Sequence, residues 1–108
     1  MTDLRINQLI AEYCGWQILE PEVHPTITYH WAIEPDGSKS ILPDYCNDLN
    51  AMHEAMKTLS EEQVEKVWET LCDMIPINPR HFRNGLVFDA PAKVRAEAFL
   101  RVIGKWKE

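Results

Sequence analysis

At 108 residues, with 45% hydrophobic side chains and four Trp, the chain has the size and apolar content of one ordinary domain, so we expect a single domain over residues 1–108. The formal net charge of −6 is unevenly spread, because residues 1–79 hold four Lys/Arg against fourteen Asp/Glu and residues 80–108 hold seven against three. This acidity excludes a general nucleic-acid coat, since non-specific binding depends on neutralising phosphates.

Hydrophobic runs and cysteines indicate where the protein works. No run approaches the ~18 apolar residues of a membrane span, and Asp3 and Arg5 interrupt the region where a secretory signal would be apolar. Cys14, Cys46 and Cys72 are an odd number at wide spacing, unlike the disulfide framework of a secreted protein. We therefore predict reduced, mostly buried thiols, no membrane partner and a location in the cytoplasm.

The first third of the sequence predicts a helix followed by strands. Residues 3–14 carry apolar side chains at helical spacing, with Asp3 as a possible N-cap and Gly15 at the C′ position. A short apolar segment at 17–19 is assigned as a first strand. Residues 26–34 alternate and predict a second strand, which has four large apolar residues on one face: Ile27, Tyr29, Trp31 and Ile33.

A turn at 35–38 should return this strand to an antiparallel partner at 40–42. Pro43 is well placed to open a second helix, which continues to about Leu59. The capping box formed by Ser60 to Gln63 begins a third helix, and Pro76 ends it. Because about two residues join these helices, we expect them to pack together as a hairpin.

The last third predicts an irregular connection at 76–85, a short buried strand at 86–88 and a final helix. Asp89 should cap this helix, whose apolar face is formed by Ala92, Ala96, Phe99, Leu100 and Ile103. The order of elements is therefore α-β-β-β-α-α-β-α. We predict an α+β fold with a small, mainly antiparallel sheet of three to four strands, flanked by helices on both faces.

Three segments carry a resemblance to a known family: LIAEYCGW at 9–16, PDYCNDLNAMHEA at 43–55 and RAEAFLRVIGKW at 95–106. In wording and order they resemble the phage ABA sandwich family of small accessory proteins from tailed phages and prophages. The resemblance implies a sheet between two helical layers. It implies no established activity, so it transfers no functional residue. The chain departs from the family pattern at 20–26 and 76–85, which the family therefore constrains least.

The start of the second predicted helix offers one candidate binding site. Asp44 and Asp48 form an i,i+4 carboxylate pair that could hold a cation or take part in acid–base chemistry. The alternative is a solvated helix start, because neither carboxylate lies beside a nucleophile or a Gly-rich loop in the sequence.

Other catalytic or metal-binding patterns are weak. Cys46 and His53 are seven residues apart, whereas structural zinc sites favour closer ligand pairs, so we predict neither a metal site nor a cofactor. No local pattern marks a Cys–His nucleophile, and we predict that the protein is not an enzyme. The tryptophans at 16, 31 and 68 lie among core-periodic residues, and we interpret them as packing residues rather than base-stacking platforms.

The cationic segment at 80–85 is the second candidate site. Arg80, His81 and Arg83 surround the aromatic Phe82 in an irregular loop that ends at Gly85. Two guanidinium groups in a loop can bind a carboxylate or a phosphate. The alternative is that this segment only neutralises the acidic helices before it.

These observations favour a phage or prophage accessory protein that binds a host or phage macromolecule in the host bacterial cytoplasm. A counter-defence inhibitor such as an anti-CRISPR is one example, and the acidic first 79 residues would suit a basic, nucleic-acid-handling complex. The alternative is a binder of an anionic small ligand, such as a sponge for a nucleotide immune signal. An enzyme acting on nucleotides or nucleic acid is a minor alternative. The charge asymmetry also makes a homo-oligomer possible.

Overall fold

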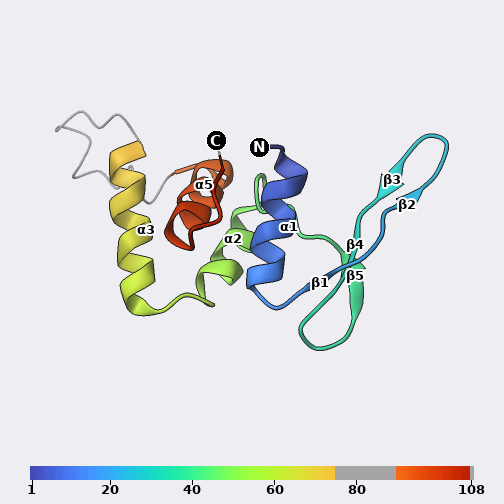
Figure 1. Ribbon diagram of the computed structural model, residues 1–108, viewed down its shortest axis with the longest axis horizontal. Coiled ribbons are helices and arrows are strands. Elements are labelled where there is room, and N and C mark those ends of the chain that lie inside the picture. The colour runs from blue at the N-terminus through green and yellow to red at the C-terminus, as the bar shows by residue number, and fades with distance from the viewer. Residues whose placement is uncertain (75–89, 108) are drawn as a thin grey trace.

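The computed structural model describes residues 1–74 and 90–107, and these residues have an α+β architecture. They contain four helices that gather into one body: α1 (Asp3–Tyr13), α2 (Leu49–Met56), α3 (Glu61–Met74) and α5 (Ala92–Val102). The strands extend from one side of this helical body as an arm (Figure 1). The expected loop at 76–85 and strand at 86–88 lie outside the described residues.

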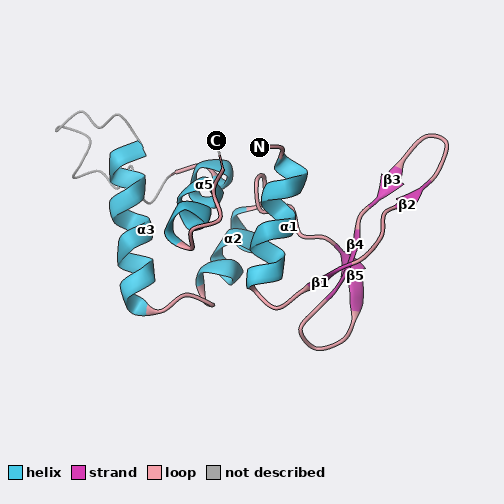
Figure 2. Cartoon of the chain, viewed as in Figure 1, coloured by secondary structure: helices cyan, strands magenta, loops and turns pink. Residues whose placement is uncertain are grey.

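The described strands form two small antiparallel sheets (Figure 2). The first sheet has the order β1-β4-β5, from Gln17–Ile18, Trp31–Ile33 and Lys39–Ile41. The second sheet joins β2 (Glu22–Val23) to β3 (Thr28–Tyr29) and lies farther from the helices. We call residues 17–42 the β arm. The α+β class and the first strand near 17–19 are therefore confirmed.

Helix α1 is closed at both ends by local hydrogen bonds. Its N-cap is Thr2, whose hydroxyl accepts from the Arg5 backbone N–H at 3.2 Å, so the prediction of Asp3 as the cap was wrong by one residue. At the other end Gly15 has a φ of +93°, as expected for the C′ position. The Gly15 N–H donates to Glu12 O and the Trp16 N–H to Ala11 O, which directs the chain into β1.

The single strand expected at 26–34 is divided. β3 pairs with β2 whereas β4 pairs with β1 and β5, so the chain passes from one sheet to the other at His30. The His30 carbonyl accepts from the Leu42 N–H at 2.8 Å, at the end of the β4–β5 pair. The alternating pattern is continuous in the sequence, but its pairing partners change.

The second helix begins later than Pro43, and that prediction was wrong. Residues 44–48 form a turn, in which the Asp48 N–H donates to the Asp44 carbonyl at 2.9 Å. Asp48 then has an extended backbone (φ −116°, ψ 105°), and its side chain accepts from the Asn50 and Ala51 N–H groups. This side-chain cap starts α2 at Leu49.

The capping box of α3 is confirmed. The Gln63 N–H donates to the Ser60 hydroxyl at 3.2 Å, and the Ser60 N–H donates to the Gln63 side-chain oxygen at 3.0 Å. By contrast, α5 follows Pro91, which makes no side-chain cap. Asp89, the expected cap of this last helix, lies outside the described residues.

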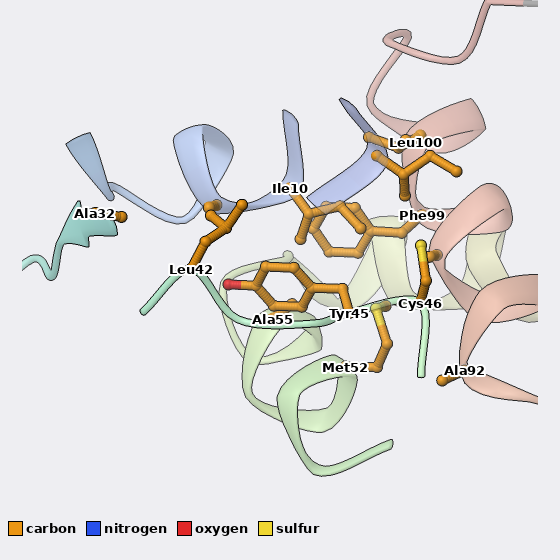
Figure 3. Packing of buried hydrophobic residues seen from close by; sticks show 13 residues of the cluster. Ile10, Ala32, Leu42, Tyr45, Cys46, Met52, Ala55, Ala92, Phe99 and Leu100 are labelled. Carbon is orange, nitrogen blue, oxygen red and sulfur yellow. The ribbon is translucent and has the colours of Figure 1, made fainter. Parts of the chain in front are cut away.

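Helix α5 is the centre of the body, because α1, α2 and α3 all pack against it (Figure 1). The expected hairpin of the second and third helices is therefore wrong, since α2 and α3 lie chiefly on α5 rather than on each other. The main core cluster takes its buried residues from α1, β4, the segment 42–46, α2 and α5 (Figure 3): Ile6, Ile10, Ala11, Ala32, Leu42, Tyr45, Cys46, Met52, Ala55, Ala92, Ala96, Phe99 and Leu100. A second cluster joins α3 to α5 through Val67, Leu71, Ala90 and Ala98.

Candidate functional site

One face of the β arm is turned away from the core. In the β4–β5 pair Ala32 lies opposite Ser40, and Ala32 is completely buried in the main cluster. Because side chains alternate across a strand, Trp31 and Ile33 lie on the other face, together with their partners Ile41 and Lys39. The bulky face of this strand is therefore the outer face, and the small Ala32 faces the helices.

Three rings form a row along the arm, which we call the aromatic row: His24, Tyr29 and Trp31. The Tyr29 and Trp31 ring centroids are 6.1 Å apart, and His24 meets Tyr29 edge to face at 5.5 Å. Lys39 Nζ lies 4.8 Å from the Trp31 ring centroid, a cation–π contact. These contacts hold the rings in defined positions on a surface that helices leave open.

Glu22 links the two sheets of the arm. Its Oε2 accepts from Trp31 Nε1 at 2.7 Å, and its Oε1 lies 3.2 Å from His24 Nε2. The hydrogen bond from Trp31, and then the contact with His24, lower the pKa of the Glu22 carboxyl below its ordinary value. The carboxylate therefore stays ionised in mildly acidic solution and orients both ends of the aromatic row.

The far end of the arm leaves apolar side chains in solvent. All residues from 21 to 29 are exposed, and Val23 and Ile27 have exposed fractions of 75% and 50%. Ile41, on the outer face near Trp31, is 51% exposed. By strand register Ile41 shares the face of Trp31, whereas Val23 pairs with Thr28 on the face opposite Tyr29, so Ile41 is the exposed apolar side chain paired with a member of the aromatic row.

The charge of the arm limits its partners. Residues 17–42 hold four acidic residues and one Lys, a net charge of −3. Aromatic rings on an open strand can stack nucleic-acid bases, but that mode needs a cationic surface to follow the phosphates. The arm carries the opposite charge, and its rings and aliphatic side chains suit a protein surface instead.

Asp44 and Asp48, the carboxylates predicted to form a binding pair, both accept hydrogen bonds from within the protein. Asp44 Oδ1 accepts from Asn7 Nδ2 and from Asn47 Nδ2, both at 3.2 Å, and Asp48 is the N-cap of α2. Asn7, which is buried, also accepts from the Cys46 N–H at 3.2 Å. Asp44 thus joins α1 to the turn before α2. The two aspartates do not lie on one helix, contrary to the prediction.

The cationic candidates Arg80, His81 and Arg83 lie outside the described residues. Of the other tryptophans, Trp16 packs against the main cluster and Trp68 against the second cluster, and both are only partly buried. Their assignment as packing residues is confirmed. Trp31, in contrast, lies on the outer face of the arm.

The described residues offer little for covalent or metal chemistry. Burial raises the pKa of the Cys14 thiol, and burial together with Asp3 and Asp44 raises the pKa of Cys46 to about 11. Both are therefore neutral thiols at physiological pH, which are poor nucleophiles. Within 1–74 and 90–107 no three or more His, Cys, Asp or Glu side chains are grouped to hold a metal ion, and no helix is long and apolar enough to cross a membrane.

Sequence reasoning missed the outer face because it assigned the bulky side of an alternating strand to the core. The signal that could have reversed the assignment is the small pair Ala32 and Ser40, which lets the sheet approach the helical body closely. No protein-family model matches the chain, and no match was found among curated proteins or solved structures.

Proposed function

We propose that the protein is a small accessory binding protein that engages a protein partner through the outer face of its β arm. The observation that carries this proposal is the aromatic row, which is held in place by Glu22 and Lys39 but left uncovered by the helices. Tyr and Trp side chains with few rotatable bonds are favoured at interfaces, because ordering them on binding costs little entropy.

Charge complementarity defines the partner further. The arm has a net charge of −3 and the residues before position 80 a net charge of −10, so the proposed partner is a protein with a basic surface around an apolar groove. Proteins that handle nucleic acid have such surfaces. The resemblance to phage ABA sandwich proteins supports a phage or prophage origin, action in the host cytoplasm and counter-defence as the biological setting.

Site-specific photo-crosslinking tests the proposal. A photoreactive benzoylphenylalanine replaces Ile27 at the far end of the arm, and in a matched control it replaces Glu65, which is exposed on α3. After irradiation of bacterial cells producing each protein, we expect one discrete protein adduct from position 27 and none from position 65. Mass spectrometry identifies the adduct.

A second pair of variants makes the test specific. Tyr29→Ser in the photoreactive protein should reduce the adduct, because it removes apolar contact area on the outer face without touching the helical core. Val23→Ser should reduce it less, because Val23 pairs with Thr28 on the opposite face of the β2–β3 pair. Equal adducts from positions 27 and 65, or adducts consisting of nucleic acid, would contradict the proposal. An adduct formed with a second copy of the chain would assign the arm to self-association instead.

A second candidate function, sequestration of an anionic small ligand, is favoured by a groove between α1 and the segment that follows α5. This groove has a volume of about 490 Å³, and its described lining includes Arg5, Lys105 and Lys107 beside Leu9, with no acidic residue. Cations around an apolar floor suit a nucleotide.

Calorimetric titration with a cyclic dinucleotide tests this second candidate. We expect Lys105→Ala and Lys107→Ala together to weaken binding, whereas the matched exposed variant Lys66→Ala on α3 should leave it unchanged. Binding should also weaken as salt concentration rises. Absence of binding by the unaltered protein at low salt ends this candidate.

A further inference from the structure

A second groove lies where the β arm joins the helical body. It has a volume of about 370 Å³, within the range typical of ligand sites. Its lining comes from four places: the end of α1, the turn after β4, the segment before α2, and α2 itself. Residues far apart in the sequence are therefore brought together around one opening, which is distinct from the aromatic row and from the groove lined by Arg5, Lys105 and Lys107.

Tyr45 gives the groove an unused polar group. The residue is only 3% exposed, but it lines the groove, and none of the hydrogen bonds found in the described part of the chain involves its hydroxyl. In Figure 3 the ring lies in the core and the hydroxyl oxygen is at the end away from Phe99 and Leu100. The hydroxyl oxygen is not among the fully buried atoms that lack a partner, so it keeps contact with solvent in the groove, where water or a ligand can complete its hydrogen bonds.

Two carboxylates give the groove a negative charge. Glu34 is half-buried, and its Oε2 accepts from the Ser40 hydroxyl at 2.8 Å, which orients the group. Glu54 stands at the exposed rim, where it pairs with Lys57 at 2.9 Å. Both side chains of that pair are more than 70% exposed, so solvent screens it strongly. Among the described lining residues none is Lys, Arg or His.

The walls of the groove suit a flat cation. The side chains of Trp16, Pro35 and Pro43 supply apolar walls. A guanidinium group stacks on aromatic faces and donates several hydrogen bonds in one plane, whereas an ammonium group is compact and more strongly hydrated. Burial raises the pKa of Tyr45 and of Cys14 in the same groove. Tyr45 is therefore a neutral hydroxyl that can accept from a guanidinium N–H.

We infer that this groove binds the guanidinium group of an arginine side chain, with Glu34 and Tyr45 accepting its hydrogen bonds and Trp16 offering a stacking face. The arginine belongs to the basic protein partner of the arm, so this part of the inference rests on the proposed function. Because Glu34 bonds to Ser40 on the Ala32 face, the partner must reach the groove around the edge of the sheet from the aromatic row. The groove would add a specific polar contact to the apolar contacts of the arm. Such a division between an apolar surface and one charged anchor is typical of protein interfaces.

Titration with a blocked arginine tests the groove without the partner. The probe is N-acetyl-L-arginine amide, and its matched control is N-acetyl-L-citrulline amide, which has nearly the same shape and no charge. Two-dimensional NMR of the isotope-labelled protein follows both titrations. We expect arginine to shift the signals of groove residues and to bind about tenfold or more tightly than citrulline, since charge-assisted hydrogen bonds are roughly twice as strong as neutral ones.

Variants locate the binding. Glu34→Gln keeps an acceptor for Ser40 but removes the charge, and it should weaken arginine binding about tenfold. Tyr45→Phe should weaken it less, because it removes one neutral acceptor. The control Glu65→Gln, exposed on α3, removes a charge outside the groove and should change nothing. If Glu34→Gln and Glu65→Gln have equal effects, binding is non-specific and the inference is wrong.

The source of the arginine is distinguished by comparing blocked with free arginine. A side chain from a partner carries no free carboxylate, so the blocked form should bind at least as tightly as free arginine. Much tighter binding of free arginine would show that the groove binds a free metabolite. It would contradict the assignment of the arginine to a partner protein. The crosslink from position 27 is independent of both titrations. A crosslinked adduct without arginine binding would contradict only the inference about the groove. Arginine binding without an adduct would contradict the proposed role of the arm.

Discussion

The helical body and the β arm use apolar side chains in opposite ways. In the body large apolar side chains, including Phe99, Ile6 and Met52, are fully buried around α5. In the arm residues 21–29 are all exposed, and the one residue of its strands that is completely buried in the core is the small Ala32. The arm therefore contributes few contacts to the core of the molecule.

This difference separates stability from recognition. Regions with few buried apolar contacts open at low free energy, whereas the central packed elements open only with the whole domain. Substitutions in the arm can therefore alter binding without unfolding the body. Substitutions made in each of the two regions test that separation.

Phe99→Ala should destabilise the protein by about 3–5 kcal/mol, the usual loss for a fully buried Phe that leaves a cavity. Phe99 is 0% exposed and also meets the Tyr13 ring edge to face at 5.7 Å. Urea unfolding followed by circular dichroism measures the free energy of unfolding. Ile27→Ala in the arm is the control and should change it by less than about 0.5 kcal/mol. Similar losses for both variants would show that the arm is part of the core.

Gly15→Ala should cost about 1–2 kcal/mol, because an L-residue is strained in the left-handed region. Gly15 has a φ of +93°, and an added Cβ would meet the Pro35 side chain at an ordinary 3.5 Å, so the backbone alone sets the cost. Thermal and urea unfolding provide the measurement. Since Gly15 lies between α1 and the arm, a cost near zero would mean that this junction rearranges freely.

Asp48→Ala should reduce the free energy of unfolding by about 1 kcal/mol, as expected for loss of an N-cap. Asp48→Asn retains an acceptor for the Asn50 N–H and should lose much less. Urea unfolding of the pair distinguishes a cap from a binding carboxylate. If both variants keep full stability but lose a ligand or partner, Asp48 returns to the list of binding residues.

The smallest effect concerns the Glu22 carboxyl in the arm. Its pKa is lowered in the folded protein, so its interactions are present while it is ionised and are lost as the pH falls through a native pKa below 4.5. The Trp31 indole N–H signal in NMR should therefore shift with a midpoint below 4.5. Glu22→Gln should abolish that step. Signals from α5 should not move with it, because the titration is local to the arm.

Local sequence rules predicted the start of α3 and the end of α1, although they misplaced the starts of α1 and α2. The Ser60–Gln63 capping box and the Gly15 C′ position depend only on residues within one turn, and both occur as expected. The apolar face of α5 was also predicted, because a buried central helix shows its period clearly. These features need no knowledge of distant contacts.

Features that depend on distant partners were predicted less well. The period of Tyr45, Leu49 and Met52 is helical, but Asp48 forms a side-chain cap that divides them, so Tyr45 enters the core from a turn. Similarly, the alternation at 26–34 indicates two faces without showing which one meets the helices. The groove at Glu34 and Tyr45 could not be predicted at all, since it combines residues from four separate segments.

The short strands of the arm also govern its tendency to aggregate. An exposed apolar strand with a free backbone edge can template pairing with other chains, and proteins blunt such edges with short strands, charges and prolines. Here β2 has two residues, Pro21 and Pro25 stand on either side of it, and neither proline has an N–H to donate. The arm therefore exposes side chains for binding but has few free backbone N–H and C=O groups in a continuous strand edge. This limits strand pairing between molecules and hence fibril growth.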